Sequence, residues 1–227
     1  MFKRFVVLCC LPVLASAQQV ELIVRDRQDV SQNDIAARVV IPHAMLEIGT
    51  VRTTSRDQWA YFTTDTHIGK AFVGGEAFIA PASKYVSRHS LGGTIGYAPS
   101  DQWSVAQRVV YYYNPDASKQ WLYTTTAEYT KPYAVLSGSV GGLTGSGVVG
   151  QVKATLLAGN SNKMILYWSN DMELPNMPWS VWVVREAGVM VELKLAPSYT
   201  VVVGRAFYGK VGTTEYTSFT IGNKIQF

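Results

Sequence analysis

Seven basic side chains stand in segments where apolar and polar residues alternate, and they could act together on an anion. They are Arg25, Arg27, Arg38, Arg108, Lys153, Arg205 and Lys224. A guanidinium group presents a fork of N–H donors that matches a carboxylate at two points, and rings of Arg and Lys in a pore favour anions. If these side chains share one wall of a passage, they predict a basic lumen that attracts anionic solutes such as acidic sugars.

The phase of the alternation decides which of these bases could meet, because neighbouring residues of a strand point to opposite faces. Arg25 and Arg27 share a face. Arg205 points inward only if Val202 and Ala206 point outward. Few acids lie inside the same segments: Glu21, Glu76, Glu128 and Glu192. The structural alternative is that Arg and Glu side chains pair across the interior and fill it.

Catalytic and metal chemistry find little support in the sequence. The three histidines, His43, His67 and His89, are scattered and lack metal-ligand spacing. There is no Gly-x-Ser-x-Gly elbow, no His-Glu-x-x-His and no phosphate-binding glycine loop. We therefore predict no catalytic residue, no metal, no cofactor and no enzymatic activity.

The composition bounds the class of protein. The chain has 227 residues, of which 48% are hydrophobic, 16% charged and 12% aromatic, so there is ample apolar material and disorder is excluded. Lys and Arg exceed Asp and Glu by 20 to 16, a bias too weak to suggest nucleic acid. The low charge, with 13 Tyr and 6 Trp, points to a membrane or a large apolar interface.

The first residues have the layout of a secretory signal peptide. Lys3 and Arg4 are followed by an apolar run to Leu14 and by small residues at Ala15 and Ala17. We predict that residues 1–17 are removed and that residues 18–227 form a single barrel domain. Both cysteines, Cys9 and Cys10, fall in this leader, so we expect no disulfide and no cysteine metal site afterwards.

The rest of the chain reads as short strands with period-2 alternation and turn residues between them. The candidates are 20–28, 34–41, 45–54, 58–66, 70–80, 88–98, 103–113, 119–130, 133–143, 147–158, 163–172, 179–186, 189–196, 199–209 and 214–227. Bacterial barrels have an even number of strands, and the weakest candidates are 45–54 and the pair within 179–196. We predict about twelve strands, with ten or fourteen as alternatives. The uncharged stretch 133–152 is interpreted as a hairpin turning near Gly145 rather than as a membrane helix.

Alternation alone does not distinguish a soluble sandwich from a membrane barrel, because the two differ only in which face is apolar. Here the polar faces carry Ser, Thr, Gly and Gln more than Lys and Glu. Aromatic residues gather at strand ends, as in the headgroup belts of membrane barrels. They are Trp59, Tyr61, Tyr97, Trp103, Tyr111, Tyr112, Tyr113, Trp121, Tyr123, Tyr133, Trp179 and Tyr199. We predict an all-β, closed antiparallel transmembrane barrel.

The last nine residues place Phe219, Ile221, Ile225 and Phe227 on one face, with Asn223 departing from the pattern. This segment resembles the terminal strand of Gram-negative outer-membrane β-barrels, which the insertion machinery reads. The first strands, with basic residues at 25, 27 and 38, resemble those of small monomeric porins of the oligogalacturonate and sialic-acid type. The resemblance implies the bacterial outer membrane as location, and the lipid bilayer, lipopolysaccharide and insertion machinery as partners of a monomer.

These expectations combine into an outer-membrane channel for small, anionic solutes such as acidic oligosaccharides. Two alternatives stay open. One is a barrel filled by side chains, with a structural or adhesion role. The other is a soluble, secreted β-sandwich that acts as a binding module.

Overall fold

The computed structural model describes residues 18–27, 32–52, 56–82, 88–114, 116–145, 147–159, 161–172, 184–211 and 214–227. The predicted leader, with Cys9 and Cys10, lies outside these residues. The strands are β1 (Gln19–Arg27), β2 (Gln32–Ile41), β3 (Ala44–Arg52), β4 (Arg56–Ile68), β5 (Ala71–Ile79), β6 (His89–Ser100), β7 (Trp103–Tyr113), β8 (Lys119–Lys131), β9 (Ala134–Leu143), β10 (Gly147–Ala158), β11 (Asn162–Met172), β12 (Val184–Ala196), β13 (Tyr199–Val211) and β14 (Thr214–Gln226).

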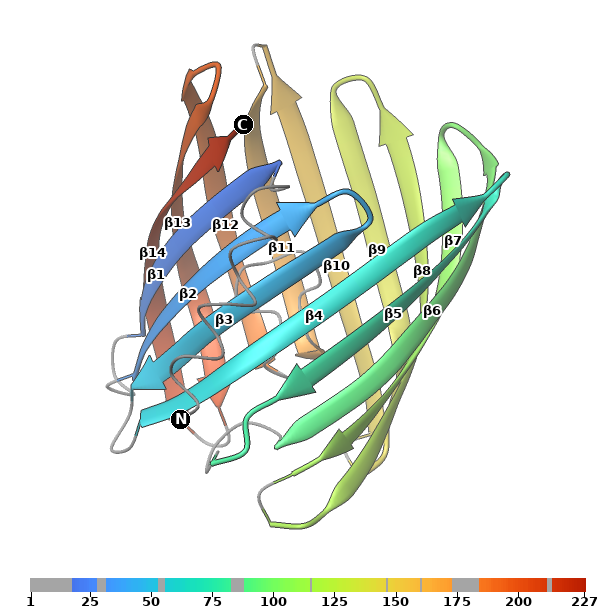
Figure 1. Ribbon diagram of the computed structural model, residues 1–227, viewed down its shortest axis with the longest axis vertical. Helices are drawn as coiled ribbons and strands as arrows, with labels where there is room; N and C mark the ends of the chain where they lie inside the picture. The colour runs from blue at the N-terminus through green and yellow to red at the C-terminus, as the bar shows by residue number, and fades with distance from the viewer. Residues whose placement is uncertain are drawn as a thin grey trace.

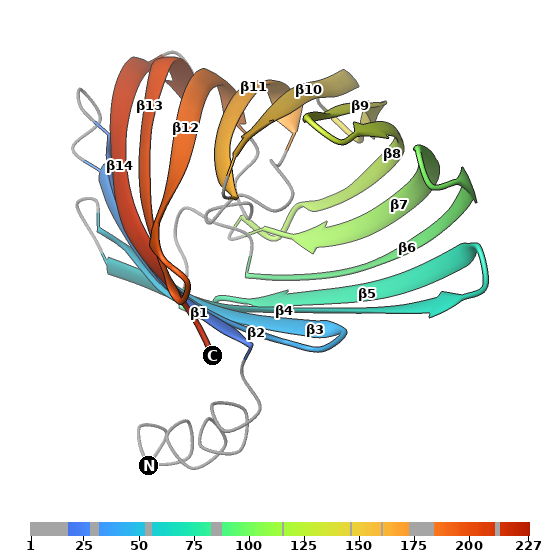
Figure 2. The same ribbon diagram turned by 90° about the horizontal axis from the view of Figure 1, so that it is seen from above.

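The strands form one closed antiparallel barrel, in which each strand pairs with the next along the chain and β1 pairs with β14 (Figures 1 and 2). At the closing seam Val24 is in register with Ile221, and the N–H of Phe227 donates to the carbonyl of Gln18 at 3.1 Å. Closure satisfies the edge N–H and C=O groups, which hydrocarbon could not do.

The predicted fold class is confirmed, but the preferred count of twelve strands is too low. The described residues contain the alternative number, fourteen. The weak candidate at 45–54 is a true strand, β3, paired along its length with β2 and β4. In the region 179–196 the sequence predicts two strands, 179–186 and 189–196. The structure has one strand there, β12, which begins at Val184, and most of the first candidate lies outside the described residues.

The uncharged stretch 133–152 is the hairpin that the sequence predicts, formed by β9 and β10. Gly145 and Gly147 have φ values of +86° and +84°, in the left-handed region where a side chain would be strained. Among the described residues, no helix is long and apolar enough to cross a membrane.

The apolar face of the barrel is its outer face. Leu91, Val148 and Val152 are exposed to 67%, 74% and 57%. Their neighbours of opposite phase point inward, where Ser90 and Gln151 are buried. A soluble protein buries its apolar side and exposes its polar side, so this reversed arrangement is that of a transmembrane barrel. The alternative of a soluble sandwich is wrong, because the sheet closes on itself and buries its polar side.

The connections distinguish the two ends of the barrel. At one end only two or three residues separate consecutive strands, from β2 and β3 to β12 and β13 in alternate pairs. At the other end nine residues separate β5 from β6, and eleven separate β11 from β12. In outer-membrane barrels the short turns face the periplasm and the long connections face outward. We call these the short-turn end and the long-loop end.

Aromatic side chains lie on the outer face near both ends. Trp103 and Tyr129 pack at 4.6 Å between ring centroids near the short-turn end, and Tyr111 and Trp121 pack at 5.0 Å near the long-loop end. These are the places that amphipathic rings take at headgroup level. Three of the predicted belt residues lie inside instead: Trp59, Tyr61 and Tyr112.

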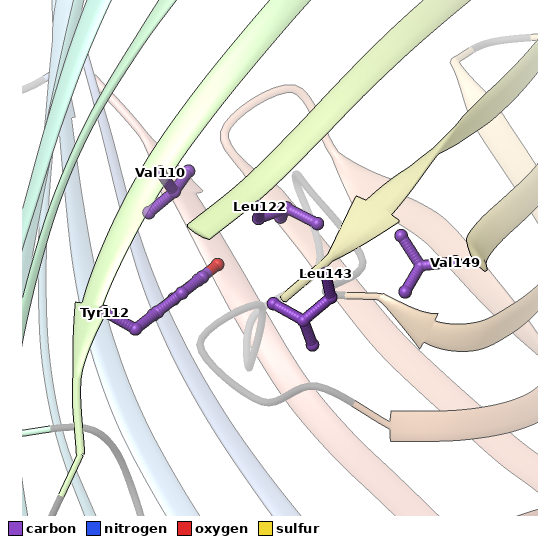
Figure 3. Packing of buried hydrophobic residues seen from close by; sticks show 5 residues of the cluster. All are labelled: Val110, Tyr112, Leu122, Leu143 and Val149. Atoms are coloured by element: carbon purple, nitrogen blue, oxygen red, sulfur yellow. The ribbon is translucent and has the colours of Figure 1, made fainter. Parts of the chain in front are cut away.

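Inward-facing apolar residues form small clusters toward the long-loop end. One consists of Val110, Tyr112, Leu122, Leu143 and Val149, contributed by four consecutive strands (Figure 3). A second joins Trp59 and Phe78 with Ala36 and Ala80. A third cluster joins Ile23, Tyr167, Met190 and Val202, so the interior combines apolar clusters with buried polar and charged residues.

Candidate functional site

A cavity of about 850 Å³ lies inside the barrel, against β2 to β7, and extends from the short-turn end toward the middle. At the short-turn end it is bordered by His43, Asp65 and His67. Deeper in, two of the predicted lumen residues, Arg38 and Arg108, line it. The cavity is thus the place where the structure brings predicted site residues together with open space.

Arg38 is held against the wall by acids on both sides. Its guanidinium donates to Glu47 on β3 at 2.8 Å and lies 3.6 Å from Glu21 on β1. Trp59 adds a third contact, donating from its indole N–H to Glu47 at 3.4 Å. Because Arg38 meets two carboxylates, its charge is more than balanced locally.

Arg108 has a similar arrangement on the opposite side of the cavity. Its Nη2 donates to Glu76 on β5 at 2.7 Å, and the hydroxyl of Tyr61 donates to the same carboxylate at 2.8 Å. A Cβ at Gly92 would lie 2.8 Å from the Glu76 carboxylate, so the glycine makes room for the acid. The pair is fixed by packing on β6 as well as by its charges.

Lys224 continues the line of charges across the closing seam. Its ammonium lies 2.8 Å from Glu192 on β12 and 3.5 Å from Glu21 on β1. Together with Arg38 and Glu47 these residues form an alternating ladder along the inner wall from β3 to β12. Lys224 points inward, as predicted, but as a member of this ladder.

Arg25 lies in a fully buried network near the long-loop end. It pairs with Glu186, and its Nε donates to Ser218 at 3.2 Å. The hydroxyls of Tyr167 and Tyr216 also donate to Glu186, at 2.7 and 2.6 Å. Arg25 and Glu186 have no exposed surface, so Arg25 points inward as predicted but does not line the cavity.

Glycines on the neighbouring strands make room for both tyrosines of this network. A Cβ at Gly188 would lie 2.6 Å from the Tyr167 hydroxyl, and one at Gly209 would lie 2.2 Å from the Tyr216 ring. The two rings therefore lie flat on bare backbone, with their hydroxyls directed at one carboxylate.

Of the two remaining predicted lumen residues, the structure describes the side chain of Lys153 but not that of Arg27. Lys153 faces inward and lies in the same row of the sheet as Glu128, with Ser137 between them. Arg27 belongs to β1, but its side chain lies outside the described part of the chain.

Arg205 does not join the others, and its predicted inward orientation is wrong. It is exposed on the outer face, in one row with Val189 and Phe219. Val202 and Ala206 face inward, where Val202 packs with Ile23, Tyr167 and Met190. The physical reason is that β13 is apolar on both faces, so alternation alone could not show which face is inside.

Replacing Arg205 with leucine should stabilise the barrel. An arginine on the lipid face costs about 2–4 kcal/mol at the midplane and about 0–1 near the interface. Arg205 lies halfway along β13, and its long side chain can reach toward the headgroups, so we expect a gain of roughly 1–2 kcal/mol. Urea unfolding in lipid vesicles measures it, and a loss of stability would place Arg205 in a necessary contact.

The charges that sequence reasoning missed are Glu47 and Glu186. With them, the inward-facing charges of the described strands balance: Arg25, Arg38, Arg108, Lys153, Lys163, Lys194 and Lys224 against Glu21, Glu47, Asp65, Glu76, Glu128, Glu186 and Glu192. Glu47 could have been found, since Leu46 and Ile48 on either side of it are apolar. The lumen is therefore charged and paired rather than basic.

Comparisons with known proteins identify the fold. No family model matches the sequence, and no curated protein matches it. Among solved structures, a KdgM porin matches with a TM-score of 0.50 and 9% identity, over 92% of this chain and 99% of that chain. A mutant of the Rh. blastica porin matches with a TM-score of 0.53 and 6% identity, over 92% and 98%. NanC porin matches with a TM-score of 0.49 and 10% identity, over 92% and 100%. The described chain thus has the fold of the outer-membrane porins.

Proposed function

We propose that the protein is an outer-membrane channel that lets small solutes diffuse through its lumen. The observation that carries the proposal is the cavity of about 850 Å³ inside a closed barrel with an apolar outer face. Barrels of eight strands have interiors that side chains can fill, whereas porins of 16 to 18 strands leave an aqueous channel. A barrel of this size, with a cavity lined by charged as well as apolar residues, falls between them and favours a narrow passage.

The finer part of the proposal concerns the solute. Acidic oligosaccharides are the class that Arg108 suits, because a guanidinium with five donors can hold one carboxylate of the protein and still bind another. Arg38 already meets two carboxylates. Glu47 and Glu76 reduce the attraction that bare arginines would exert. We therefore propose weak anion selectivity, carried by Arg108.

The specific test uses two opposite changes of charge in the cavity. Arg108→Ser should shift the reversal potential in a salt gradient toward cations, and Glu76→Gln should shift it toward anions, because each leaves its partner's charge facing the passage. The double variant should return close to the unmodified protein. Planar-bilayer recordings measure all four proteins, and unheated gel migration checks that each is folded.

Two outcomes would contradict this proposal in different ways. Conductance with unchanged reversal potentials would mean that the cavity lies off the limiting path. A complete absence of conductance would favour the second candidate, a filled barrel with a structural or adhesion role. That candidate has its own support in the buried cluster around Leu122 and Val149, both with no exposed surface (Figure 3).

The route to the membrane also belongs to the proposal. The predicted insertion residues Phe219, Ile221 and Ile225 all lie on the outer face, at 48%, 50% and 41% exposure, and Phe227 is 81% exposed. This placement supports their proposed recognition by the insertion machinery of a bacterial outer membrane. Cell fractionation tests the location, and a variant with Phe227 changed to Ser should accumulate outside the membrane fraction.

A further inference from the structure

Phe72 presents an open aromatic face to the cavity near the short-turn end. Its side chain lines the cavity from β5. A Cβ at Gly96, its register partner on β6, would overlap the ring, so one face of Phe72 lies flat on bare backbone and the other is turned to the lumen. His67, its register partner on β4, stands beside it, with ring centroids 5.6 Å apart and ring planes tilted by 36°. The two rings form a corner that is open toward the cavity.

Asp65 is the carboxylate next to this corner. It precedes His67 by two residues on β4 and therefore points to the same side of the sheet. Phe72 is its diagonal neighbour on β5, at a backbone separation of about 7–8 Å, so one ligand group can contact both side chains. Gly74, the register partner of Asp65, adjoins both, and a Cβ there would lie only 3.0 Å from the Thr64 carbonyl. The floor beside the carboxylate is therefore bare backbone.

The turn between β2 and β3 fixes the backbone at Asp65. The N–H of Asp65 donates to the carbonyl of His43 at 2.9 Å, and the hydroxyl of Thr64 donates to the same carbonyl at 2.9 Å. The end of β4 is thus tied to its neighbour where the cavity begins, and the carboxylate starts from a defined position.

Asp65 is also the least compensated charge that lines the cavity. The two arginines of the cavity lie in ion pairs with glutamates, as described above. Among the described residues, the ion-pair partner of Asp65 is His67, at 3.7 Å, which is charged only when it is protonated. The Asp65 side chain is 55% exposed. When His67 is neutral, this end of the cavity therefore presents a carboxylate that attracts cations.

The charges around Asp65 strengthen this attraction. A second cavity, of about 280 Å³, shares part of its lining with the first and contains Asp101, Glu128 and Lys70. Lys153 is a further base on this side of the lumen, in one row with Glu128. Among the described inward-facing and turn residues of β4 to β10 at this end, the three acids outnumber the two bases.

An apolar stretch of wall adjoins the carboxylate. Val40 and Met45 are register partners on β2 and β3, and both line the cavity, as does Pro42 in the turn between these strands. A carboxylate beside an open aromatic face suits an ammonium group, through opposite charge and through cation–π attraction. The apolar wall suits the hydrocarbon part of such an ion.

We propose that this end of the cavity binds an organic ammonium ion that carries a flat apolar ring. The ammonium group lies on the free face of Phe72 and against Asp65, and the ring lies against Val40 and Met45. The site is separate from the arginine–glutamate pairs deeper in the cavity. It goes beyond the proposed function, since binding here requires no conductance. An inorganic cation would use Asp65 alone, and an aromatic acid would be repelled by it.

Isothermal titration calorimetry of the barrel in a non-ionic detergent tests the proposal with benzyltrimethylammonium. The unmodified protein should bind one equivalent. Phe72→Leu keeps an apolar side chain but removes the aromatic face, and it should weaken binding about fivefold. Asp65→Asn removes the charge at constant shape and should also weaken binding about fivefold. Tetramethylammonium, which lacks the ring, and benzoate, which reverses the charge, should both bind more weakly.

Matched controls lie on the outer face of the barrel. Phe207→Leu makes the same change on β13, at a side chain that is 61% exposed. Asp26→Asn removes a carboxylate from β1, where Asp26 is exposed and shares the outward phase of Val24. Both controls should bind benzyltrimethylammonium like the unmodified protein. Unheated gel migration checks that each variant is folded, and Asp65→Asn alone decides the test if Phe72→Leu does not fold.

Unchanged binding by folded Phe72→Leu or by Asp65→Asn would overturn the proposal, as would equal weakening by the controls. Benzoate or tetramethylammonium that binds as tightly as benzyltrimethylammonium would overturn it too. Calorimetry measures binding in detergent, whereas the channel proposal is tested by conductance in bilayers. A barrel that binds the ligand but passes no ions would therefore contradict the channel and support this site.

Discussion

Arg25→Leu should lower the free energy of unfolding by about 3–5 kcal/mol, the usual cost of breaking a buried ion pair from one side. The loss arises less from the missing attraction than from Glu186, whose charge would remain buried beside the tyrosine hydroxyls without its cationic partner. Ser218 would lose a contact as well. Urea unfolding in lipid vesicles, followed by tryptophan fluorescence, measures the change.

The double variant Arg25→Leu with Glu186→Leu separates the cost of an uncompensated charge from the value of the pair. Replacing both members of a buried pair by apolar residues is often neutral. We therefore expect the double variant to be more stable than Arg25→Leu alone, although Tyr167 and Tyr216 lose their acceptor. A double variant that is less stable than either single one would show that Glu186 acts independently of Arg25.

Val152→Lys should cost about 2–4 kcal/mol, because it places an ammonium group in hydrocarbon near the midplane. Val152 lies midway along β10, is 57% exposed, and stands in an outward row between Gly138 and Trp168. The same unfolding measurement applies.

The matched substitution inside the barrel is Thr63→Lys. Thr63 lies midway along β4, lines the cavity and is the register partner of Glu76 on β5, so a lysine there faces open space and an opposite charge. We expect a cost of roughly 1 kcal/mol or less, as for most substitutions at accessible sites. Equal costs at the two positions would contradict the assignment of inner and outer faces.

Most of the fold could be predicted from the sequence, because period 2 is a direct consequence of strand geometry. The phase of β10 illustrates this: Val152 and Lys153 lie on the faces that alternation assigns to them. The strand count could not be predicted as well. Ala44–Arg52 is a short strand with a glycine inside it, and nothing local separates it from a loop until β2 and β4 pair with it.

The candidate site could be predicted only in part. The sequence places Arg38 and Arg108 on inward faces, but it does not show that Glu47 and Glu76 lie beside them. Glu47 comes from the adjacent strand, and Glu76 reaches Arg108 across the intervening strand β6, each at a particular register. The predicted inward orientation of Arg205 is wrong for a related reason. Both faces of β13 are apolar or small near it, and the deciding fact is the packing of Val202 against Ile23 and Met190, on distant strands.

The seam between β1 and β14 has a consequence for how long the protein lasts once formed. These strands come from opposite ends of the described chain, and Arg25 with Ser218 and Glu21 with Lys224 tie them together. Pairings so distant in sequence form late in folding. Interactions that are absent from the transition state govern the rate of unfolding rather than the rate of folding. The seam contacts therefore slow unfolding. Their removal should shorten the lifetime of the inserted barrel while leaving its assembly rate almost unchanged.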